Sequence, residues 1–519
     1  MGQGIYFLEW IIMDKMDMAK KPNIVYIFSD QHRGDTMGCA GNPAAITPNM
    51  DRLAAEGVNF EQCCTNSPLC MPARASMMSG QYVSEHGVWR NSLGTDPKGP
   101  SHVRNIRDAG YRTALVGKTH LYQAERGKIH TKHYIPVMED WGFTDPHEIN
   151  GLVVSIFGDS HYTDFLEKRG LLDDHRRFMV DYCIPWLSGK NKPWEDPPNP
   201  LPIDAMMDSY IGNTAADWIR NYDGEDPFYL QVLFMGPHDP FDAPDQFRDL
   251  YQSADIPDAI MESPGEPVPD YTKRVQAISA PLDGMTKEEM RRMRQLYYAK
   301  VSQIDHCIGS VIKALEEKGM MEDTWIVYNS DHGDNLADHF LTQKVVFYES
   351  ALKIPLIIRP PGGISGWKST ALCDHLDVAA SLIGMADGKP LEKSDGRSLV
   401  PQILAEKDSP RANEGKEVIF SEVVGYSMVF DGRYKLTVEA ESQKPVEMFD
   451  LQEDPKELIN FVNHPEYEEV RQQLLENHLS KLHQRLDISA LKDPKRTRDP
   501  IQGGNLLKMI EALKKEKYS

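Results

Sequence analysis

Short runs of apolar residues recur along the chain up to about residue 360 and end in polar or glycine-rich segments. The first run, residues 23–28, is rich in β-branched and aromatic side chains and leads directly into Ser29 and Asp30. Runs of this length and composition are typical of strands that are buried on both faces of a sheet. Four further runs have the same character: residues 113–116, 228–234, 324–328 and 355–358.

Helical periodicity occupies the stretches between these runs. Residues 50–56 end at Gly57, and residues 377–385 form another short amphipathic segment. A longer amphipathic stretch runs to Glu317, and its start is marked by Thr286 and Glu289, which have the spacing of a capping box. The alternation of buried strands with helices predicts an α/β domain. Polar residues should gather where its strands end, which is the usual place of a ligand site in such sheets.

The pattern changes after about residue 397. Three short strand candidates follow, at residues 418–421, 426–430 and 434–438. The last two flank Asp431-Gly432, a pair typical of a hairpin turn, and a charged helical stretch comes next at 466–486. We therefore predict a catalytic domain at 21–400 and a smaller α+β subdomain at 401–519, in which antiparallel strands are covered by a helix. Residues 185–202 are rich in proline, and we expect a surface loop or lid there.

The composition narrows the classes of partner. A chain of 519 residues is long enough for a large core and more than one domain. Its formal net charge of -21 argues against nucleic acid, so an anionic substrate must be bound by a few local cations. Seven cysteines are too sparse for a disulfide framework and indicate a reduced, cytoplasmic setting.

The N-terminus carries an apolar run at residues 5–13, which Glu9 interrupts. No positive charge precedes this run and no small-residue cleavage site follows it, so we interpret residues 1–20 as a leader or an N-terminal arm. The run is too short to cross a bilayer, and we expect a soluble protein with no membrane partner. The charged C-terminal helix and tail are compatible with a homo-oligomer, although the oligomeric state stays open.

The segment Cys70-Met-Pro72-Ala-Arg74 is the most informative part of the sequence. Pro72 stands where a helix can begin, which would place Cys70 at the helix N-terminus. Free N–H groups and the helix dipole favour an anion at that position. A single cysteine is otherwise most often a small buried apolar residue, so the choice depends on the rest of the chain.

Cys-x-Pro-x-Arg resembles the modification signal of the type I sulfatases, a family of the alkaline phosphatase superfamily. The chain is similar to that family from about residue 22 to its C-terminal domain, because further motifs follow in the family's order: Asp30-Gln31, Gly117-Lys118-Thr-His120, Gly236-Pro-His238, Ser330-Asp-His-Gly-Asp334 and Lys344. The resemblance implies a large mixed central sheet flanked by helices. It also implies one divalent metal ion and the oxidation of Cys70 to formylglycine (3-oxoalanine) by a formylglycine-generating enzyme.

The resemblance assigns roles to single residues. The metal would be bound by Asp30, Gln31, Cys70, Asp331 and His332, and the sulfate by Lys118, Lys344 and Asn91. Arg74 would hold the hydrated aldehyde, His238 would protonate the leaving alcohol, and His120 would take a proton from the hydrate to release sulfate. Taken alone, each lysine is more typical of a solvated surface than of a site, and His238 is as typical of a loop cap as of an acid.

The chain departs from many sulfatases at two positions. Asp30-Gln31 and Asp331-His332 stand where those enzymes carry Asp-Asp and Asp-Asn. One imidazole and fewer carboxylates shift the expected metal from calcium toward manganese, iron or zinc. The same pairs resemble phosphonate monoester hydrolases, whereas Lys118 and His120 favour a sulfatase.

Three hypotheses about function result. The first is hydrolysis of sulfate monoesters, aryl or small-molecule, by a sulfuric ester hydrolase. The second is a phosphonate monoester or phosphodiester hydrolase that uses the same nucleophile. The third is a sulfatase-like binding protein that is inactive because Cys70 stays a thiol. The negative charge argues against a sulfated glycosaminoglycan and is compatible with a cationic alcohol such as choline. The loops near 140–210 and 240–275, which we expect to form the pocket, contain no further signal for the identity of the leaving group.

Overall fold

We describe the protein from a computed structural model. The described residues are 21–518 apart from 92–93, 123–129, 264, 279–281, 283 and 486–503. The predicted leader or arm at residues 1–20 lies outside them. No helix within the described residues combines the length and the apolar character needed to span a membrane.

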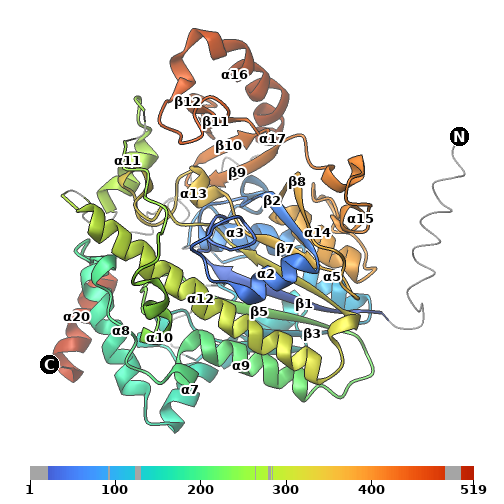
Figure 1. Cartoon of the computed structure of the whole chain (residues 1–519), viewed down its shortest axis with the longest axis vertical. Helices are drawn as coiled ribbons and strands as arrows, with labels where there is room; N and C mark the ends of the chain where they lie inside the picture. The colour runs from blue at the N-terminus through green and yellow to red at the C-terminus, as the bar shows by residue number, and fades with distance from the viewer. Residues whose placement is uncertain are drawn as a thin grey trace, which may run out of the picture.

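An eight-stranded sheet forms the centre of the molecule (Figure 1). Its strands are β1 (Asn23–Asp30), β2 (Val58–Cys64), β3 (Arg112–Gly117), β4 (Asp145–Glu148), β5 (Phe228–Pro237), β6 (Thr324–Ser330), β7 (Leu356–Arg359) and β8 (Trp367–Asp374). The order is β4-β3-β5-β1-β6-β7-β2-β8, and β7 runs antiparallel to both of its neighbours while the other pairs are parallel. The expected mixed sheet is therefore confirmed, and all five predicted strands belong to it.

Helices cover both faces of this sheet, because alternate side chains of each buried strand point to opposite faces. On β1, Val25 and Ile27 enter one apolar cluster, while Ile24, Tyr26 and Phe28 enter another. The first cluster includes residues of α2 (Pro48–Ala55), α9 (Met207–Arg220) and α12 (Lys287–Glu317). The second includes residues of α3 (Cys70–Ser79), α5 (His102–Asp108), α6 (Ile135–Trp141) and α14 (His375–Met385). The predicted capping box is present: the Thr286 side chain accepts from the Glu289 N–H at the start of α12.

A second, four-stranded antiparallel sheet lies at one end of the molecule (Figure 1). It consists of β9 (Ile419–Val423), β10 (Tyr426–Phe430), β11 (Tyr434–Glu439) and β12 (Pro445–Asp450). The hairpin expected around Asp431-Gly432 joins β10 to β11. The covering helix is present as α16 (Glu468–Leu474), a π-helical turn and α17 (Ser480–His483), with Leu474 and Leu479 packed in the same apolar cluster as the strands.

The proline-rich stretch differs in part from the loop that we expected. Pro185 lies inside α8 (Leu172–Leu187), two residues before its end, and Trp194 is buried in a 3₁₀ turn at Pro193–Glu195. Only parts of residues 188–202 are therefore an exposed loop. The last helix, α20 (Gly504–Lys517), packs against α8 through Ile510, far from the four-stranded sheet (Figure 1).

Candidate active site

Four neighbouring parallel strands bring the predicted residues to one edge of the large sheet. β3, β5, β1 and β6 are adjacent in that order, and their carboxyl ends lead into Lys118, His238, Asp30 and Asp331. Asp30 pairs in register with Pro237, the residue before His238. The topology therefore gathers residues that are 300 positions apart in the chain, as is usual at the carboxyl ends of α/β sheets.

Cys70 is the first residue of α3, so the helix begins two residues earlier than Pro72 would suggest. The thiol is buried and lies beside the strand ends, with Sγ 3.1 Å from His332 Nε2 and 3.8 Å from Asp30 Oδ1. Burial, reinforced by the charge of Asp30, raises the pKa of this thiol to about 12. An unmodified Cys70 would therefore be protonated at neutral pH and would be a poor nucleophile.

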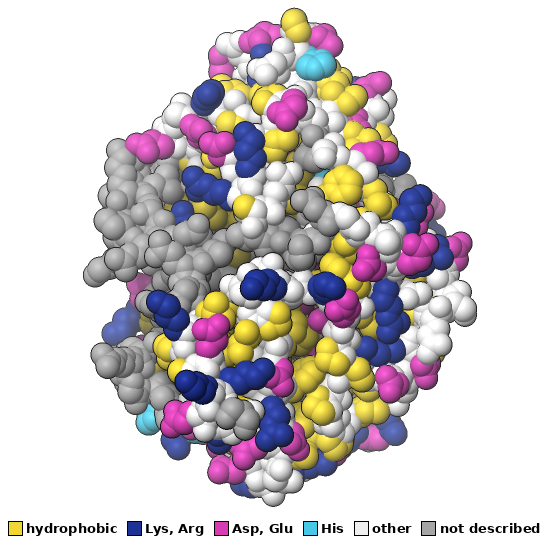
Figure 2. Space-filling model, turned by 90° about the vertical axis from the view of Figure 1, so that its left-hand side faces the viewer, with side chains coloured by type: hydrophobic (Ala, Val, Ile, Leu, Met, Phe, Trp, Pro, Cys, Tyr) yellow, Lys and Arg dark blue, Asp and Glu magenta, His cyan; other side chains and the backbone are white. Residues whose placement is uncertain are grey.

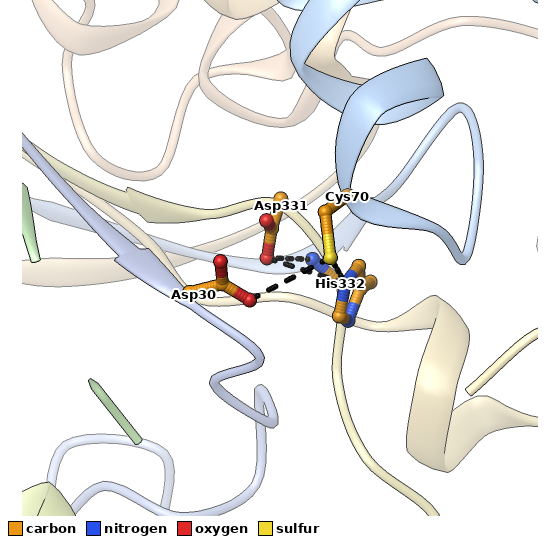
Figure 3. A group of neighbouring side chains, drawn as sticks. All are labelled: Asp30, Cys70, Asp331 and His332. Carbon is orange, nitrogen blue, oxygen red and sulfur yellow. Dashed lines mark hydrogen bonds and ion pairs between the residues drawn. The ribbon is translucent and has the colours of Figure 1, made fainter. Parts of the chain in front are cut away.

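Four side chains converge as a candidate metal centre (Figure 3). One ligand atom each from Asp30, Cys70, Asp331 and His332 lies within 4.8 Å of all the others. The His332 Nδ1–H donates to the Gly333 carbonyl at 2.9 Å, which leaves Nε2 free to face the centre. The group contains two carboxylates and one imidazole, a donor set that suits a divalent cation.

Gln31, the fifth predicted ligand, lies beside this group in a left-handed backbone conformation with φ 69. Its amide nitrogen donates to Asp334 and its amide oxygen accepts from Lys344. The Gln31 side chain thus connects the metal centre to the predicted sulfate clamp. Its role as a direct metal ligand stays a prediction.

Three cations surround the carboxylates. Arg74 donates to Asp331 at 2.9 Å, to Asp30 at 3.0 Å and to the Lys118 carbonyl at 2.8 Å. Lys118 Nζ lies 3.4 Å from Asp30 Oδ2. Burial alone would raise the pKa of Asp30, but Lys118 and Arg74 hold it well below its ordinary value. Burial likewise opposes charge on Lys344, yet Cys70 and Asp30 raise the pKa of that lysine, so it stays protonated.

The two predicted acid–base histidines border the same site. Burial, together with Lys118, keeps the pKa of His120 well below its ordinary value, and its Nδ1 has no hydrogen-bond partner among the described residues. His238 Nδ1 lies 2.8 Å from the Asp239 carbonyl and 3.1 Å from Asp239 Oδ1. Burial and Lys344 lower the pKa of His238 as well. Both imidazoles are therefore mainly neutral at neutral pH in the absence of a bound anion.

Asn91 is the remaining predicted substrate-binding residue. Its side-chain oxygen accepts the backbone N–H of Met71 at 3.0 Å, in the first turn of α3. It therefore supports the helix N-terminus that carries Cys70. Contact with a sulfate group stays a prediction.

Sequence reasoning missed three acidic residues next to the site. Asp239 accepts from Gln343 at 2.8 Å and also from Tyr182, and it lies beside His238. Asp334 binds Gln31, as described above. Glu148, at the end of β4, accepts both the Thr119 N–H at 3.1 Å and the Thr119 hydroxyl at 3.0 Å. Asp334 could have been found because it is the last residue of the Ser330–Asp334 motif, and Asp239 because it directly follows His238. Nothing in the sequence around Glu148 points to the site.

Comparison with known proteins places this geometry in a family. The sulfatase family model matches residues 22–388, and the model described as N-sulphoglucosamine sulphohydrolase, C-terminal, matches residues 337–485. An arylsulfatase of Clostridium perfringens is 30% identical over 455 residues, which cover 86% of this chain and 92% of that protein. A choline-sulfatase of Rhizobium meliloti is 31% identical and covers 86% of this chain and 83% of its own.

A solved phosphonate monoester hydrolase of Agrobacterium radiobacter has the same fold. Its TM-score is 0.71 at 24% identity, and the match covers 90% of this chain and 96% of the other. At that identity the likeness supports the alkaline-phosphatase-like fold alone. The match to the sulfatase model extends over most of the large sheet and includes Cys70 and every candidate metal ligand. The chain belongs to the sulfatase family of sulfuric ester hydrolases.

Proposed function

We propose that the protein hydrolyses sulfate monoesters of aryl or other small alcohols with a formylglycine nucleophile derived from Cys70. The observation that carries this proposal is the position of Cys70 at the N-terminus of α3, 3.1 Å from His332 and among two carboxylates and three cations. The reaction requires such an arrangement, because a sulfuryl group is transferred while negative charge must be bound on its oxygens.

The donor set at the sheet edge fits one divalent metal ion. Asp30, Asp331 and His332 would hold it together with the modified side chain at position 70. Calcium prefers a shell of oxygens, so the imidazole of His332 favours manganese, iron or zinc. The bound ion would supply positive charge that acidifies the nucleophile and neutralises the sulfate.

The cations of the chain would bind the substrate and orient the nucleophile. Lys118 and Lys344 carry the ammonium groups nearest to Asp30 and Gln31, where sulfate oxygens would meet them. Arg74 is fixed by Asp30 and Asp331 and would hold residue 70 from the next turn of the same helix. These positive charges are needed because the protein as a whole is strongly negative.

The two histidines would move protons on opposite sides of the transferred group. His120 is neutral and its Nδ1 is unpartnered among the described residues, so it can accept a proton from the nucleophile side and release sulfate. His238 would give its proton to the leaving alcohol. A bound sulfate would favour the protonated form of His238, since an adjacent negative charge raises the pKa of an imidazole.

A phosphonate monoester or phosphodiester substrate is the second candidate. The solved phosphonate monoester hydrolases share the fold, and the pairs Asp30-Gln31 and Asp331-His332 are compatible with that activity. Lys118 and His120 favour sulfate, because they place a cation and a base where the sulfatase chemistry needs them. An inactive binding protein would require that Cys70 stays a thiol.

The maturation partner and the compartment also belong to the proposal. A formylglycine-generating enzyme would oxidise Cys70 before the site is closed, because the folded thiol is only 3% exposed. None of the seven cysteines, all of which lie in the described part of the chain, forms a disulfide. That pattern agrees with our proposal of a cytoplasmic location.

The test combines the mass of the Cys70 peptide with turnover. In protein from its native host we expect a loss of about 18 Da relative to the thiol peptide, together with faster hydrolysis of an aryl sulfate than of an aryl phosphonate monoester. A Cys70→Ala variant is the matched control and should lack both the mass change and the activity. An aldehyde together with faster phosphonate hydrolysis would keep the nucleophile and replace sulfate esters by phosphonate monoesters as the substrate. A reduced Cys70 with neither activity would overturn the proposal.

A further inference from the structure

One buried lysine anchors both ends of the loop that carries His238, through two carboxylates. Lys300 lies in the middle of α12 and is 5% exposed. Its Nζ donates to Asp208 Oδ2 at 3.3 Å and to Asp242 Oδ1 at 2.9 Å. Asp208, on α9, binds the backbone at the start of this loop, and Asp242 lies four residues after His238. The ammonium group therefore links the two ends of the segment.

Asp208 reaches the near end of the loop through the backbone. Its Oδ1 accepts the N–H groups of Met235 at 2.8 Å and of Gly236 at 3.0 Å, at the end of β5. Gly236 fits closely here, because a Cβ at that position would lie 2.9 Å from Ile304 Cδ1 and 3.1 Å from Asp208 Oδ2. The carboxylate therefore fixes the backbone two residues before His238.

Asp242 holds the far end. Its Oδ2 accepts from the Asn199 side chain at 2.6 Å, and its carbonyl accepts the Asn199 N–H at 2.9 Å. Asp208 and Asp242 are both almost completely buried, so bulk solvent compensates little of either negative charge. Lys300 is the cation that balances them, and its loss would release both contacts at once.

A small cavity lies between this cluster and His238. Its volume is about 10 Å³, room for about one water molecule, and its walls include His238, Gly236, Asp208, Asp242 and Lys300. His238 therefore lines the same small cavity as the Lys300 cluster.

We propose that Lys300 is a positioning residue for His238, acting through Asp208 and Asp242 to keep the imidazole where it can protonate the departing alcohol. This inference rests on the proposed function, in which His238 is the general acid. His238 Nδ1 is engaged by Asp239, so Nε2 is the nitrogen that faces a substrate. A shift of about 1 Å in such a group lowers a rate by about 100-fold.

The test uses a double variant that preserves the buried charge. Lys300→Met with Asp242→Asn removes one positive and one negative charge, keeps Asp208 and its two backbone contacts, and breaks only the link across the loop. Asp242→Asn alone is the milder variant if the double one does not fold. The control is Lys435→Met with Glu457→Gln, which breaks another buried lysine–carboxylate cluster, between β11 and Glu349.

The measurement is kcat/KM for aryl sulfates whose leaving phenols range from strongly to weakly acidic. Loss of a general acid lowers kcat/KM most for esters with weakly acidic leaving groups. The ratio of kcat/KM for 4-nitrophenyl sulfate to that for phenyl sulfate should therefore rise about 10-fold or more in the Lys300 variant. The control should lower thermal stability and leave this ratio unchanged. A simple loss of stability would lower both rates equally.

His238→Gln is measured in the same series to separate the two proposals. If His238→Gln raises the ratio and the folded Lys300 and Asp242 variants do not, the positioning role is overturned and the proposed function stands. If His238→Gln leaves the ratio unchanged, the assignment of His238 as the acid fails and the inference fails with it. A raised ratio in His238→Gln and also in the Lys300 variant supports the inference.

Discussion

At the scale of single residues, Arg74 illustrates why the site needs particular side chains and not only their charge. Its planar guanidinium donates to two carboxylates and two backbone carbonyls at the same time while it is 2% exposed. A lysine has one compact ammonium group and cannot reproduce this fork. Two buried carboxylates would then share a weaker partner, and residue 70 would lose its support.

We therefore expect Arg74→Lys to lower kcat/KM for an aryl sulfate by about 100-fold and to lower the melting temperature. The activity is divided by the fraction of peptide that carries the modified residue 70, because Arg74 also belongs to the modification motif. Arg112→Lys is the matched control, since the Arg112 side chain is 45% exposed and pairs with Asp145. Wild-type kcat/KM in Arg74→Lys would show that the fork is not needed.

The residue scale also shows where sequence reasoning stops. Asp30, Lys118 and His238 could be predicted as a group because each follows a recognisable buried strand. Lys300 could not, because a lysine in a long amphipathic helix normally faces solvent and only the packing of α9 and β5 encloses it. Lys344 was found by resemblance alone, since the chain reaches it through a loop with left-handed residues such as Gln343 and Val345.

At the scale of elements, strands buried on both faces were predictable and strands with one exposed face were not. β8 alternates buried and exposed positions over its first half, including the exposed Lys368, and β2 is interrupted by the exposed Glu61. Their hydrophobic signal is therefore weaker than that of β1 or β6. The antiparallel direction of β7 depends on contacts with β6 and β2, which no local pattern encodes.

The contact between β12 and the large domain should make the stability of the protein depend on pH. Glu447 is buried and accepts from Tyr271 at 2.6 Å and from Tyr348 at 3.4 Å. Burial raises the pKa of Glu447 to about 7. The folded state therefore binds a proton that the unfolded state releases near pH 4.3. This contribution to stability is fully present below that pH and is lost as the pH rises through about 7.

Glu447→Gln keeps the shape of the protonated side chain and removes its titration. The melting temperature of the variant minus that of the wild type should rise by about 3 °C between pH 5.5 and 8. Glu453→Gln lies at an exposed position in the following turn. The difference between its melting temperature and that of the wild type should not change between pH 5.5 and 8. A flat difference for Glu447→Gln would mean that the carboxylate is already ionised in the folded protein at pH 5.5.

At the scale of the whole molecule, the net charge of -21 opposes the substrate that the site is built to bind. On the face shown in Figure 2, the described acidic and basic side chains are interspersed and form no continuous basic patch. The cations that face the metal centre are largely enclosed, so salt screens them less than it screens the surface. The long-range field and the local site therefore act in opposite directions on a sulfate ester.

Salt separates these two effects. Raising the NaCl concentration from about 10 to 300 mM shortens the Debye length from about 30 to below 8 Å and removes most of the surface repulsion. We expect kcat/KM for an aryl disulfate to rise by about 3-fold or more, that for an aryl monosulfate to rise less, and that for the sulfate ester of a quaternary ammonium alcohol, which is neutral overall, to stay constant or fall. The three esters measured in one salt series provide their own control, because an effect of salt on the catalytic step would move all of them together. A uniform decrease with salt would instead mean that the enclosed cations dominate the approach of the substrate, and that the acidic surface does not select against polyanions.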